Sequence, residues 1–577
     1  MKRLSKFLLV GAALAVLALV LVPVFAQEGE GGIIIDSTFG SSGADTLNPS
    51  LCLDTTCQRL VGLLYPSLAA VDPPSATVQP GAPGGLAESW DVSEDGLVYT
   101  FHLRDDWVWS DGTPVTANDI VYAWNVITNP ENESDLSFLS AENGGTIESV
   151  EAPDDHTVVV TFSVVDCTAV STAGSIQALP SHVLPEDAVM IGSDWNTNPT
   201  VTGGVFTFAS YSPEQVGLQA NPDYPEEDTQ LGYVSPTGWV QKLVGDQNVQ
   251  VEQFLAGEIS FIEGPPVGRR ADIRAAAERG EAQVYEYPGN SWDYLAFNLA
   301  DPTNPQDAYD EDGNPIDQGH HPLFGDVRVR RAIQMAIDVE AIIEGAVFGE
   351  GTQMASGQIP TSWGHDPDLE PVPYDPEAAA ELLAEAGWRD EDGDGVLEAH
   401  GAQYAEDGTP FQFTLYTNEG NPRRAAIGQV VQDQLGQLGI QVDFQTIDFN
   451  ALIDNVMLSQ TFDALILGWR EGFPDDPDQE QLFASTSDTV NAGSNFMSYN
   501  NPEVDRLLRE ALTMPGCDPE DRAPLYHEVE RILQEDQPYV WLFVQDGMYA
   551  ARAEVQNFDP LPAQPIWNVD AWSVISQ

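Results

Sequence analysis

The segment LAESWDVSEDGLVYTFHLRDDWVWSDGTPVTAND, residues 86–119, carries the signals for a strand, a turn and a helix start in close succession. Apolar and polar residues alternate from Val98 to Leu103, as expected of a half-buried strand. Asp111-Gly112 is a turn signal. Thr116 stands three residues before Asp119, a spacing typical of a capping box at the start of a helix. The stretch therefore predicts a strand, a tight turn and an amphipathic helix.

Outward from this stretch, helical and strand patterns alternate, which predicts α/β lobes with largely buried sheets. Helices are expected at Thr55–Leu64, Val327–Ile343, Pro376–Ala386, Pro422–Leu438 and Glu503–Leu512, and strands at Gln412–Tyr416, Gln441–Phe444 and Ala464–Leu467. The acidic, Gly- and Pro-rich segment 301–321 is expected to be a surface loop. A chain of 577 residues exceeds what one hydrophobic core usually serves, so two or more domains are predicted.

The first 26 residues have the pattern of a secretory signal peptide. A basic start and a short apolar run (residues 7–22) precede Val24-Phe25-Ala26, which places small residues where a signal peptidase requires them. Cleavage after Ala26 is the expectation. An uncleaved membrane anchor is the alternative, although the apolar run is shorter than the roughly 20 residues that span a bilayer. Either way the sequence predicts a periplasmic or extracellular protein.

The composition is strongly acidic, with a formal net charge of −69. Such a surface repels nucleic acids and anionic membranes, so neither is an expected partner. The acidic residues are spread along the chain, and Lys242 is the only lysine after the leader. This spread favours a general adaptation for solubility or salt over a patch that steers cationic ligands. An apolar fraction of 42% with 13 Trp excludes a disordered acidic tail, because it supplies ample core.

Four cysteines in an exported chain favour disulfides over zinc ligands, since no paired histidines or second close cysteine pair accompanies them. Four cysteines allow three connectivities. The short spacing between Cys52 and Cys57 makes this pair the first expectation, which leaves Cys167 and Cys517 as a long-range pair.

The sequence contains none of the common catalytic motifs. G-x-S-x-G, H-E-x-x-H and the phosphate-binding G-x-x-x-x-G-K-[ST] are all absent, so no enzymatic activity is predicted. Catalytic carboxylate pairs cannot be recognised among so many acids. His320-His321 is a possible metal-binding pair, but a solvent-exposed loop position is the preferred interpretation. His527-Glu528 is interpreted as a surface pair on a helix.

One pattern indicates a structural metal ion. Asp390, Asp392, Asp394 and Gly395 reproduce D-x-D-x-D-G, the first half of a calcium-binding loop. The twelfth position is Gly401 rather than a bidentate Glu, although Glu398 lies near. A Gly- and Asp-rich hairpin turn explains the same residues. Calcium at Asp390, Asp392 and Asp394 is thus an expectation with a structural role, and no other cofactor is predicted.

The motifs of residues 86–119 resemble the signature of the family 5 extracellular solute-binding proteins, the peptide, nickel and oligosaccharide class of ABC importers. Further matching motifs follow in the expected order: GGVF (203–206), NPDY (221–224), LAFN (295–298), DVRVRRA (326–332), AID (336–338), YDP (374–376), LLAEAGW (382–388) and YNNPEVD (499–505). Most of these residues form turns, helix caps and apolar faces, so they identify the fold and are poor candidates for the ligand site.

This resemblance implies a two-lobed hinged fold of the type II, cluster C-like periplasmic binding proteins, with an extra inserted domain. The implied division is a signal peptide (1–26), lobe I (27–70, 176–288 and 537–577), an inserted domain II (71–175) and lobe II (289–536). Ligands of this class lie between the lobes, which close around them. The implied partners are a small solute and the membrane permease subunits of an ABC importer, and the chain is expected to be a monomer.

The segment GWREGFPDDP (468–477) resembles the ligand-binding G-W…D-P segment of the family and follows a predicted strand end, where open α/β sheets place ligands. In peptide binders of the family an aspartate of this segment pairs with the α-amino group of the peptide. Gly472 stands at the aligned position, so Asp475 or Asp476 would have to replace it. Trp469 offers a flat face for a sugar, an aromatic ring or a cation, with core packing as the alternative.

The remaining ligand candidates are Phe473, Arg424, Trp292 and Tyr294. Arg423 and Arg424 follow Asn421-Pro422 at a helix start that favours a carboxylate, although two solvated arginines explain the same residues. Trp292 and Tyr294 lie near the implied crossing between lobes. Together these features predict capture of a peptide-like solute, with an oligosaccharide as the alternative and a secreted hydrolase as a less favoured one.

Overall fold

The computed structural model describes residues 31–39, 43–52, 55–143, 145–310, 312–472 and 475–575. The predicted signal peptide and Phe473 lie outside these residues. No helix in the described ranges is long and apolar enough to cross a bilayer.

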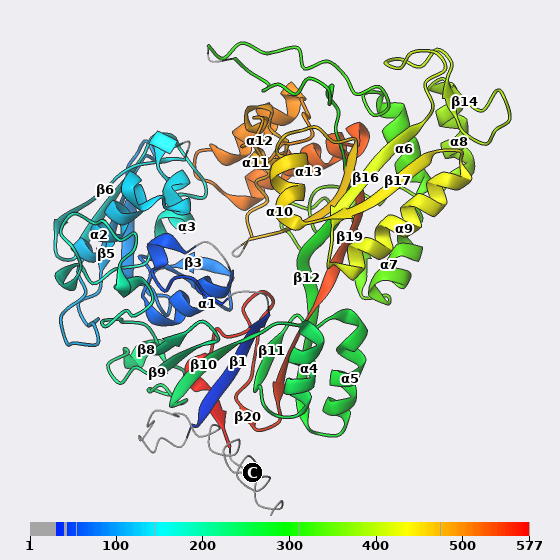
Figure 1. Cartoon of the computed structure of the whole chain (residues 1–577). Helices are drawn as coiled ribbons and strands as arrows, with labels where there is room; N and C mark the ends of the chain where they lie inside the picture. The colour runs from blue at the N-terminus through cyan, green and yellow to red at the C-terminus, as the bar shows by residue number, and fades with distance from the viewer. Residues whose placement is uncertain are drawn as a thin grey trace, which may run out of the picture.

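Two four-stranded sheets form the N-terminal part of the chain (Figure 1). The first has the strand order β1 (Ile33–Phe39), β10 (Gly238–Val244), β9 (Gln215–Ala220), β8 (Phe206–Ser212), with β1 parallel to β10. The second has the order β4 (Ala87–Val92), β5 (Val98–Leu103), β7 (Thr157–Phe162), β6 (Ile147–Asp154). One continuous hydrophobic core serves both sheets.

The strand, turn and helix predicted for residues 86–119 are confirmed. β5 has alternate residues buried, and α2 (Ala117–Thr128) follows the turn. The backbone N–H of Thr116 donates to Asp119 Oδ2 at 3.0 Å, and the indole N–H of Trp109 donates to the same oxygen at 3.1 Å. The buried Asp119 carboxylate therefore fixes both the start of α2 and the position of the preceding turn.

A seven-stranded sheet dominates the rest of the molecule. Its main order is β11 (Phe261–Glu263), β19 (Tyr539–Arg552), β12 (Ala282–Phe297), β18 (Ala464–Arg470), β16 (Gln412–Asn418), β17 (Gln441–Ile447), and β13 (Gly351–Gln353) pairs with β19. β16 runs parallel to both neighbours, and α9 (Pro422–Gln437) makes the crossover from β16 to β17.

Helices cover this sheet and flank the others. They are α1 (Thr55–Leu64), α3 (Ala169–Gly174), α4 (Gln247–Leu255), α5 (Val267–Glu278), α6 (Val327–Ala336), α7 (Val339–Val347), α8 (Pro376–Glu385), α10 (Phe449–Leu452), α11 (Glu480–Phe483), α12 (Pro502–Leu512) and α13 (Pro519–Asp536). Three two-stranded ribbons complete the fold: β2 (Ala70–Asp72) with β3 (Thr77–Gln79), β14 (Trp388–Arg389) with β15 (Glu398–Ala399), and β20 (Val555–Gln556) with β21 (Ser573–Val574).

The single helix predicted over Val327–Ile343 is wrong, because the structure has two helices there. Ile337 is extended, with φ −102° and ψ 117°. Asp338 then accepts a hydrogen bond from the backbone N–H of Ala341 at 2.9 Å and starts α7. A local cap therefore overrides an apolar periodicity that runs through both helices.

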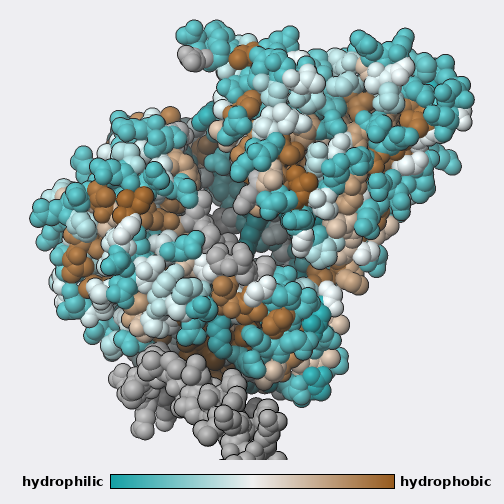
Figure 2. Space-filling model, viewed as in Figure 1, coloured by the Kyte–Doolittle hydropathy of each residue, from teal (hydrophilic) through white to brown (hydrophobic). Residues whose placement is uncertain are grey.

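The hydrophobic cores divide the molecule into two lobes. The cores of lobe I draw on residues 34–282 and 548–572, and those of lobe II draw on residues 292–544. β12 and β19 pair with each other and pass from one lobe into the other. The exact limits of the predicted lobes and of domain II stay a prediction. Figure 2 shows a recess between the lobes and a mostly hydrophilic visible face.

The crossing between the lobes is irregular and closely packed. The pairing of β12 with β19 shifts register between Tyr287 and Ser291. A Cβ on Gly289 would lie 1.9 Å from the carbonyl oxygen of Gln545, and a Cβ on Gly547 would lie 2.1 Å from the Tyr287 ring. Both glycines are therefore required for the two strands and the Tyr287 ring to approach this closely.

Candidate functional site

A cavity of about 220 Å³ lies where the crossing strands meet the two lobes. The crossing segment, lobe II and the C-terminal part of lobe I each supply part of its wall. The lining residues are Tyr287, Pro288, Gly289, Asn290, Ile359, Thr361, Glu471, Gly472, Asp475, Pro562 and Ala563. Because both lobes contribute, a solute held here contacts both of them at once.

Glu471 is the acidic group at the end of β18. Its backbone N–H donates to the carbonyl of Asn290 at 2.9 Å, and the Asn290 side chain donates to the Glu471 carbonyl at 2.8 Å. The buried indole of Trp292 donates to Glu471 Oε1 at 2.6 Å. Burial, with a smaller contribution from the charge of Asp475, raises the pKa of Glu471 to about 7. A carboxyl group with such a pKa gains strongly from a cationic partner.

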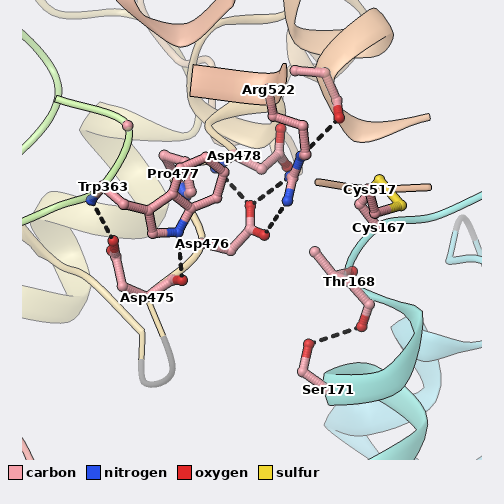
Figure 3. A network of polar contacts seen from close by, with 12 residues as sticks. Cys167, Thr168, Ser171, Trp363, Asp475, Asp476, Pro477, Asp478, Cys517 and Arg522 are labelled. Carbon is pink, nitrogen blue, oxygen red and sulfur yellow. Dashed lines mark hydrogen bonds and ion pairs between the residues drawn. A yellow bond between two sulfur atoms is a disulfide. The ribbon is translucent and has the colours of Figure 1, made fainter. Parts of the chain in front are cut away.

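Asp475 is the second acid of the cavity. One carboxylate oxygen accepts from Ser362 Oγ at 2.8 Å and from the backbone N–H of Trp363 at 3.2 Å. The indole of Trp363 donates to the Asp475 carbonyl at 3.1 Å (Figure 3). Burial raises the pKa of Asp475 above its usual value. These bonds fix the carboxylate against the cavity wall.

Asp476 does not line the cavity. Its two carboxylate oxygens each accept from Arg522 of α13 at 3.0 Å, and the Arg522 guanidinium lies over the Trp363 ring (Figure 3). This bidentate pair holds the segment that carries Asp475 on α13. Asp476 is therefore a positioning residue for the cavity acid rather than a lining residue.

The cavity is acidic. Of the described residues that line it, two are carboxylic acids and none is Lys, Arg or His. Two carboxylates near each other with no basic neighbour favour a cationic group as their partner. The cavity is thus suited to an ammonium group rather than to a carboxylate.

The three predicted aromatic residues that the structure describes, Trp292, Tyr294 and Trp469, form one cluster outside the cavity lining. Trp292 and Tyr294 are each 1% exposed. The half-buried Trp469 stacks on Tyr294 with an interplanar angle of 23°, and its indole N–H lies 3.5 Å from the Tyr539 hydroxyl. Trp469 therefore has one face occupied by protein, and only Trp292 reaches the cavity indirectly, through its bond to Glu471.

Arg423 and Arg424 are not the two freely solvated arginines that the sequence also allowed, because both are paired with a buried acid. Both bind the buried carboxylate of Asp293: Arg423 Nε at 2.6 Å and Arg424 Nε at 3.1 Å. Arg423 also donates to Gln545 Oε1 at 2.6 Å. Asp293 attracts them because its carboxylate is 2% exposed and needs a charged partner. Neither arginine lines the cavity.

The expectation that His320-His321 is exposed is wrong for His321. His321 is 1% exposed, and its Nδ1 accepts from the backbone N–H of Leu323 at 3.1 Å. Its Nε2 therefore carries the proton and donates to Asp463 at 3.2 Å. His320 stacks on Tyr404. The proline that follows the histidine pair suggested an exposed loop. Instead, the His321 ring accepts hydrogen bonds from the backbone N–H groups of Leu323 and Phe324 and so stabilises the turn at this proline.

Two disulfides are present among the described residues, Cys52–Cys57 and Cys167–Cys517. The first closes a short loop at the start of α1, and the second joins residues that are 350 positions apart.

The predicted calcium loop lies on the β14–β15 ribbon. Oxygen atoms of Asp390, Asp392, Asp394 and Glu398 all lie within 4.8 Å of one another. Asp390 also accepts from the backbone N–H groups of Gly393 and Gly395 at 2.7 and 3.0 Å, as a hairpin turn requires. Glu398 supplies the fourth carboxylate that Gly401 does not. Calcium binding here stays a prediction.

These features define a two-lobed solute-binding protein with an acidic cavity between its lobes. The family model for bacterial extracellular solute-binding proteins, family 5 Middle, matches residues 82–491. The chain belongs to this family, and the predicted two-lobed α/β fold is confirmed.

Relatives and solved structures agree with this assignment. The chain is 28% identical to the oligopeptide-binding protein AppA of Bacillus subtilis, over 93% of this chain and 91% of that protein. It is 26% identical to di/tripeptide-binding protein 1 of Pseudomonas aeruginosa, over 79% of each. The structure of B. subtilis AppA with a nonapeptide has a TM-score of 0.72 at 26% identity, covering 95% of this chain and all of that one.

Residue patterns alone missed Glu471. The resemblance to the family aligned its neighbour Gly472 with the aspartate of peptide binders, and Asp475 and Asp476 were the predicted replacements. The sequence signal that could have identified Glu471 is its position directly after the predicted strand, because open α/β sheets place ligands at strand ends.

Proposed function

We propose that this chain captures a peptide-like solute between its lobes outside the cytoplasm and delivers it to the permease subunits of an ABC importer. It performs no chemistry of its own and acts as a monomer. Residues 1–26 direct its export. The observation that carries the proposal is the acidic cavity lined by both lobes. The relatives named above that bind oligopeptides or di- and tripeptides support a peptide as the solute.

The amino end of the peptide is the group that the cavity accepts. An ammonium group between Glu471 and Asp475 makes charge-assisted hydrogen bonds and relieves the cost of two partly buried carboxyl groups. Glu471 thereby takes the role of the aspartate that the family resemblance implies at the position of Gly472. The oligosaccharide alternative rested on Trp469 as a stacking face and on the missing aspartate; Tyr294 packs against one face of that ring, and Glu471 offers an acid next to Gly472.

Native mass spectrometry of the protein purified without denaturation tests the solute class. Bound masses that match peptides, and that disappear after acid extraction, are the expected result. A saccharide mass in their place contradicts the peptide proposal. Incubation of the recovered solute with the protein should return it unchanged, because hydrolysis products would show an enzyme.

A matched pair of probes tests the anchored end. Trialanine carries a free ammonium group, whereas an acetyl cap turns this group into a neutral amide in N-acetyl-trialanine. Isothermal titration calorimetry should detect binding of trialanine and a large loss of affinity for the acetylated peptide. Equal affinities would show that the acidic cavity does not hold the amino end.

A further inference from the structure

Three covalent connections join the two lobes in the described part of the chain. β12 and β19 are the first two, and the Cys167–Cys517 disulfide is the third. Cys167 lies between β7 and α3 on the side of the N-terminal sheets. Cys517 lies between α12 and α13 of lobe II (Figure 3). The disulfide therefore bridges the lobes rather than stabilising one of them.

The disulfide is separate from the strand crossing. β12 and β19 pair along most of their length, so these two connections act as one attachment. In Figure 1, α3 faces the α11–α12 region across the upper part of the gap, whereas β12 and β19 cross lower in the view. The lobes are thus attached at two distinct places.

A backbone hydrogen bond and a cavity between the lobes accompany the disulfide. The backbone N–H of Cys167 donates to the carbonyl of Leu512 at 2.9 Å. Beside it lies a cavity of about 480 Å³, lined by residues of both lobes that include Asp166, Thr168, Glu480 and Arg509. The disulfide is thus the covalent connection between the lobes at an edge where a cavity also separates them.

Hydrogen bonds order the residues next to both cysteines. On one side, the buried Asp166 accepts from Thr146 Oγ1 and from the backbone N–H of Thr168, each at 2.7 Å. On the other side, Asp518 caps α13 through the backbone N–H of Glu520 at 2.9 Å. Each cysteine therefore lies next to the hydrogen-bonded start of a helix, α3 or α13.

We propose that the Cys167–Cys517 disulfide is a clasp that fixes the axis of lobe movement. A body attached at two separate places can turn only about the line that joins them. The lobes then rotate about the line from the β12–β19 crossing to the disulfide, and the cleft opens along the edges away from this line. Without the clasp the lobes separate further. The proposal does not depend on which solute is bound.

Small-angle X-ray scattering of the solute-free protein tests the clasp. Dithiothreitol reduces the bond by thiol–disulfide exchange: the Sγ–Sγ bond breaks, two thiols form and the dithiol becomes a cyclic disulfide. The variant C167S/C517S removes the bond permanently. The matched control C52S/C57S removes the other disulfide, which lies within lobe I.

Reduced wild-type protein and C167S/C517S should both show a radius of gyration at least about 1 Å above that of the oxidised protein, from a starting value of roughly 24 Å for a compact chain of this size. Oxidation of the wild-type protein should restore the smaller value, and C52S/C57S should scatter like the oxidised wild type. Far-UV circular dichroism must be unchanged throughout.

Two results would overturn the clasp. The first is identical scattering of oxidised and reduced wild-type protein with an intact fold. The second is loss of secondary structure on reduction, because a clasp holds together two lobes that are already folded. If the C167S/C517S variant fails to fold, the comparison of oxidised and reduced wild-type protein by scattering tests the clasp by itself.

Discussion

Replacing Glu471 by Gln should weaken the binding of a peptide with a free amino end and remove its pH dependence near neutrality. The ammonium group loses a charge-assisted hydrogen bond in a buried site, which costs about 1.5–3 kcal/mol, or about 10- to 150-fold in Kd. The variant keeps the size of the side chain, and its amide oxygen still accepts from Trp292. Loss of packing therefore does not explain a change in affinity.

The pKa of about 7 sets the pH profile. Only ionised Glu471 attracts the ammonium group, and the ionised fraction falls from about one half at pH 7 to about one eleventh at pH 6. The affinity for trialanine should therefore fall about fivefold between these pH values, while the peptide amine stays protonated because its pKa is near 8. Binding at pH 7 should also release about half a proton per peptide, since the bound carboxyl group is fully ionised.

Calorimetry in two buffers of different ionisation enthalpy measures both quantities. Glu381→Gln, an exposed substitution on α8, is the control for a change of one charge. Repetition in 0.5 M NaCl screens the general attraction of a chain with net charge −69 for cations. A fivefold pH effect that persists in E471Q would refute the assignment of Glu471.

The solute-free protein provides an independent check on the same pKa. Because the folded-state pKa of Glu471 is raised, the stability that its neutral form provides is fully present below pH 4.5 and is lost as the pH rises through 7. Between pH 5 and pH 8 this loss amounts to about 2.5 kcal/mol. In urea unfolding, the free energy of unfolding of E471Q should therefore fall by about 2.5 kcal/mol less than that of the wild type between pH 5 and pH 8. An unchanged pH profile in E471Q contradicts the raised pKa.

Three further substitutions test the surrounding structure. Asp293→Asn leaves two guanidinium groups without their buried carboxylate and should cost about 3–5 kcal/mol in urea unfolding, whereas Asp312→Asn in an exposed loop should cost almost nothing. Gly547→Ala places a Cβ 2.1 Å from the Tyr287 ring and should cost about 1–3 kcal/mol, while Gly436→Ala on α9 meets open space and should not destabilise; equal effects would contradict the packing. Calcium at ten times its Kd should stabilise the protein by about 1.4 kcal/mol in thermal melts, and Asp392→Asn should abolish this gain. No shift at 10 mM calcium would exclude a calcium site of the affinity usual for extracellular modules.

Much of the fold could be predicted from local patterns. The β5 alternation and the Thr116–Asp119 cap depend on residues close in sequence, and the structure reproduces both. The break at Ile337 could not be predicted, because Asp338 fits a helix surface as well as a cap.

The site was less predictable because its contacts are distant in sequence. Asp293 is separated from Arg423 by 130 positions, so nothing near the arginines shows that they are paired. Glu471 becomes a cavity acid only together with distant residues such as Pro562 and Ala563 of lobe I, which line the same cavity. The sequence allowed Trp469 to be either a stacking surface for a ligand or a core residue. Only the structure shows that its ring packs on Tyr294.

The position of β19 has a consequence for how the chain folds during synthesis. Tyr539 to Val544 belong to the cores of lobe II, and Met548 to Ala551 belong to the cores of lobe I. Neither core is complete until this strand has left the ribosome, so a nascent chain that lacks it stays incompletely folded. We expect that a chain built in this way stays unfolded enough to pass through a secretion channel until its translation is nearly finished.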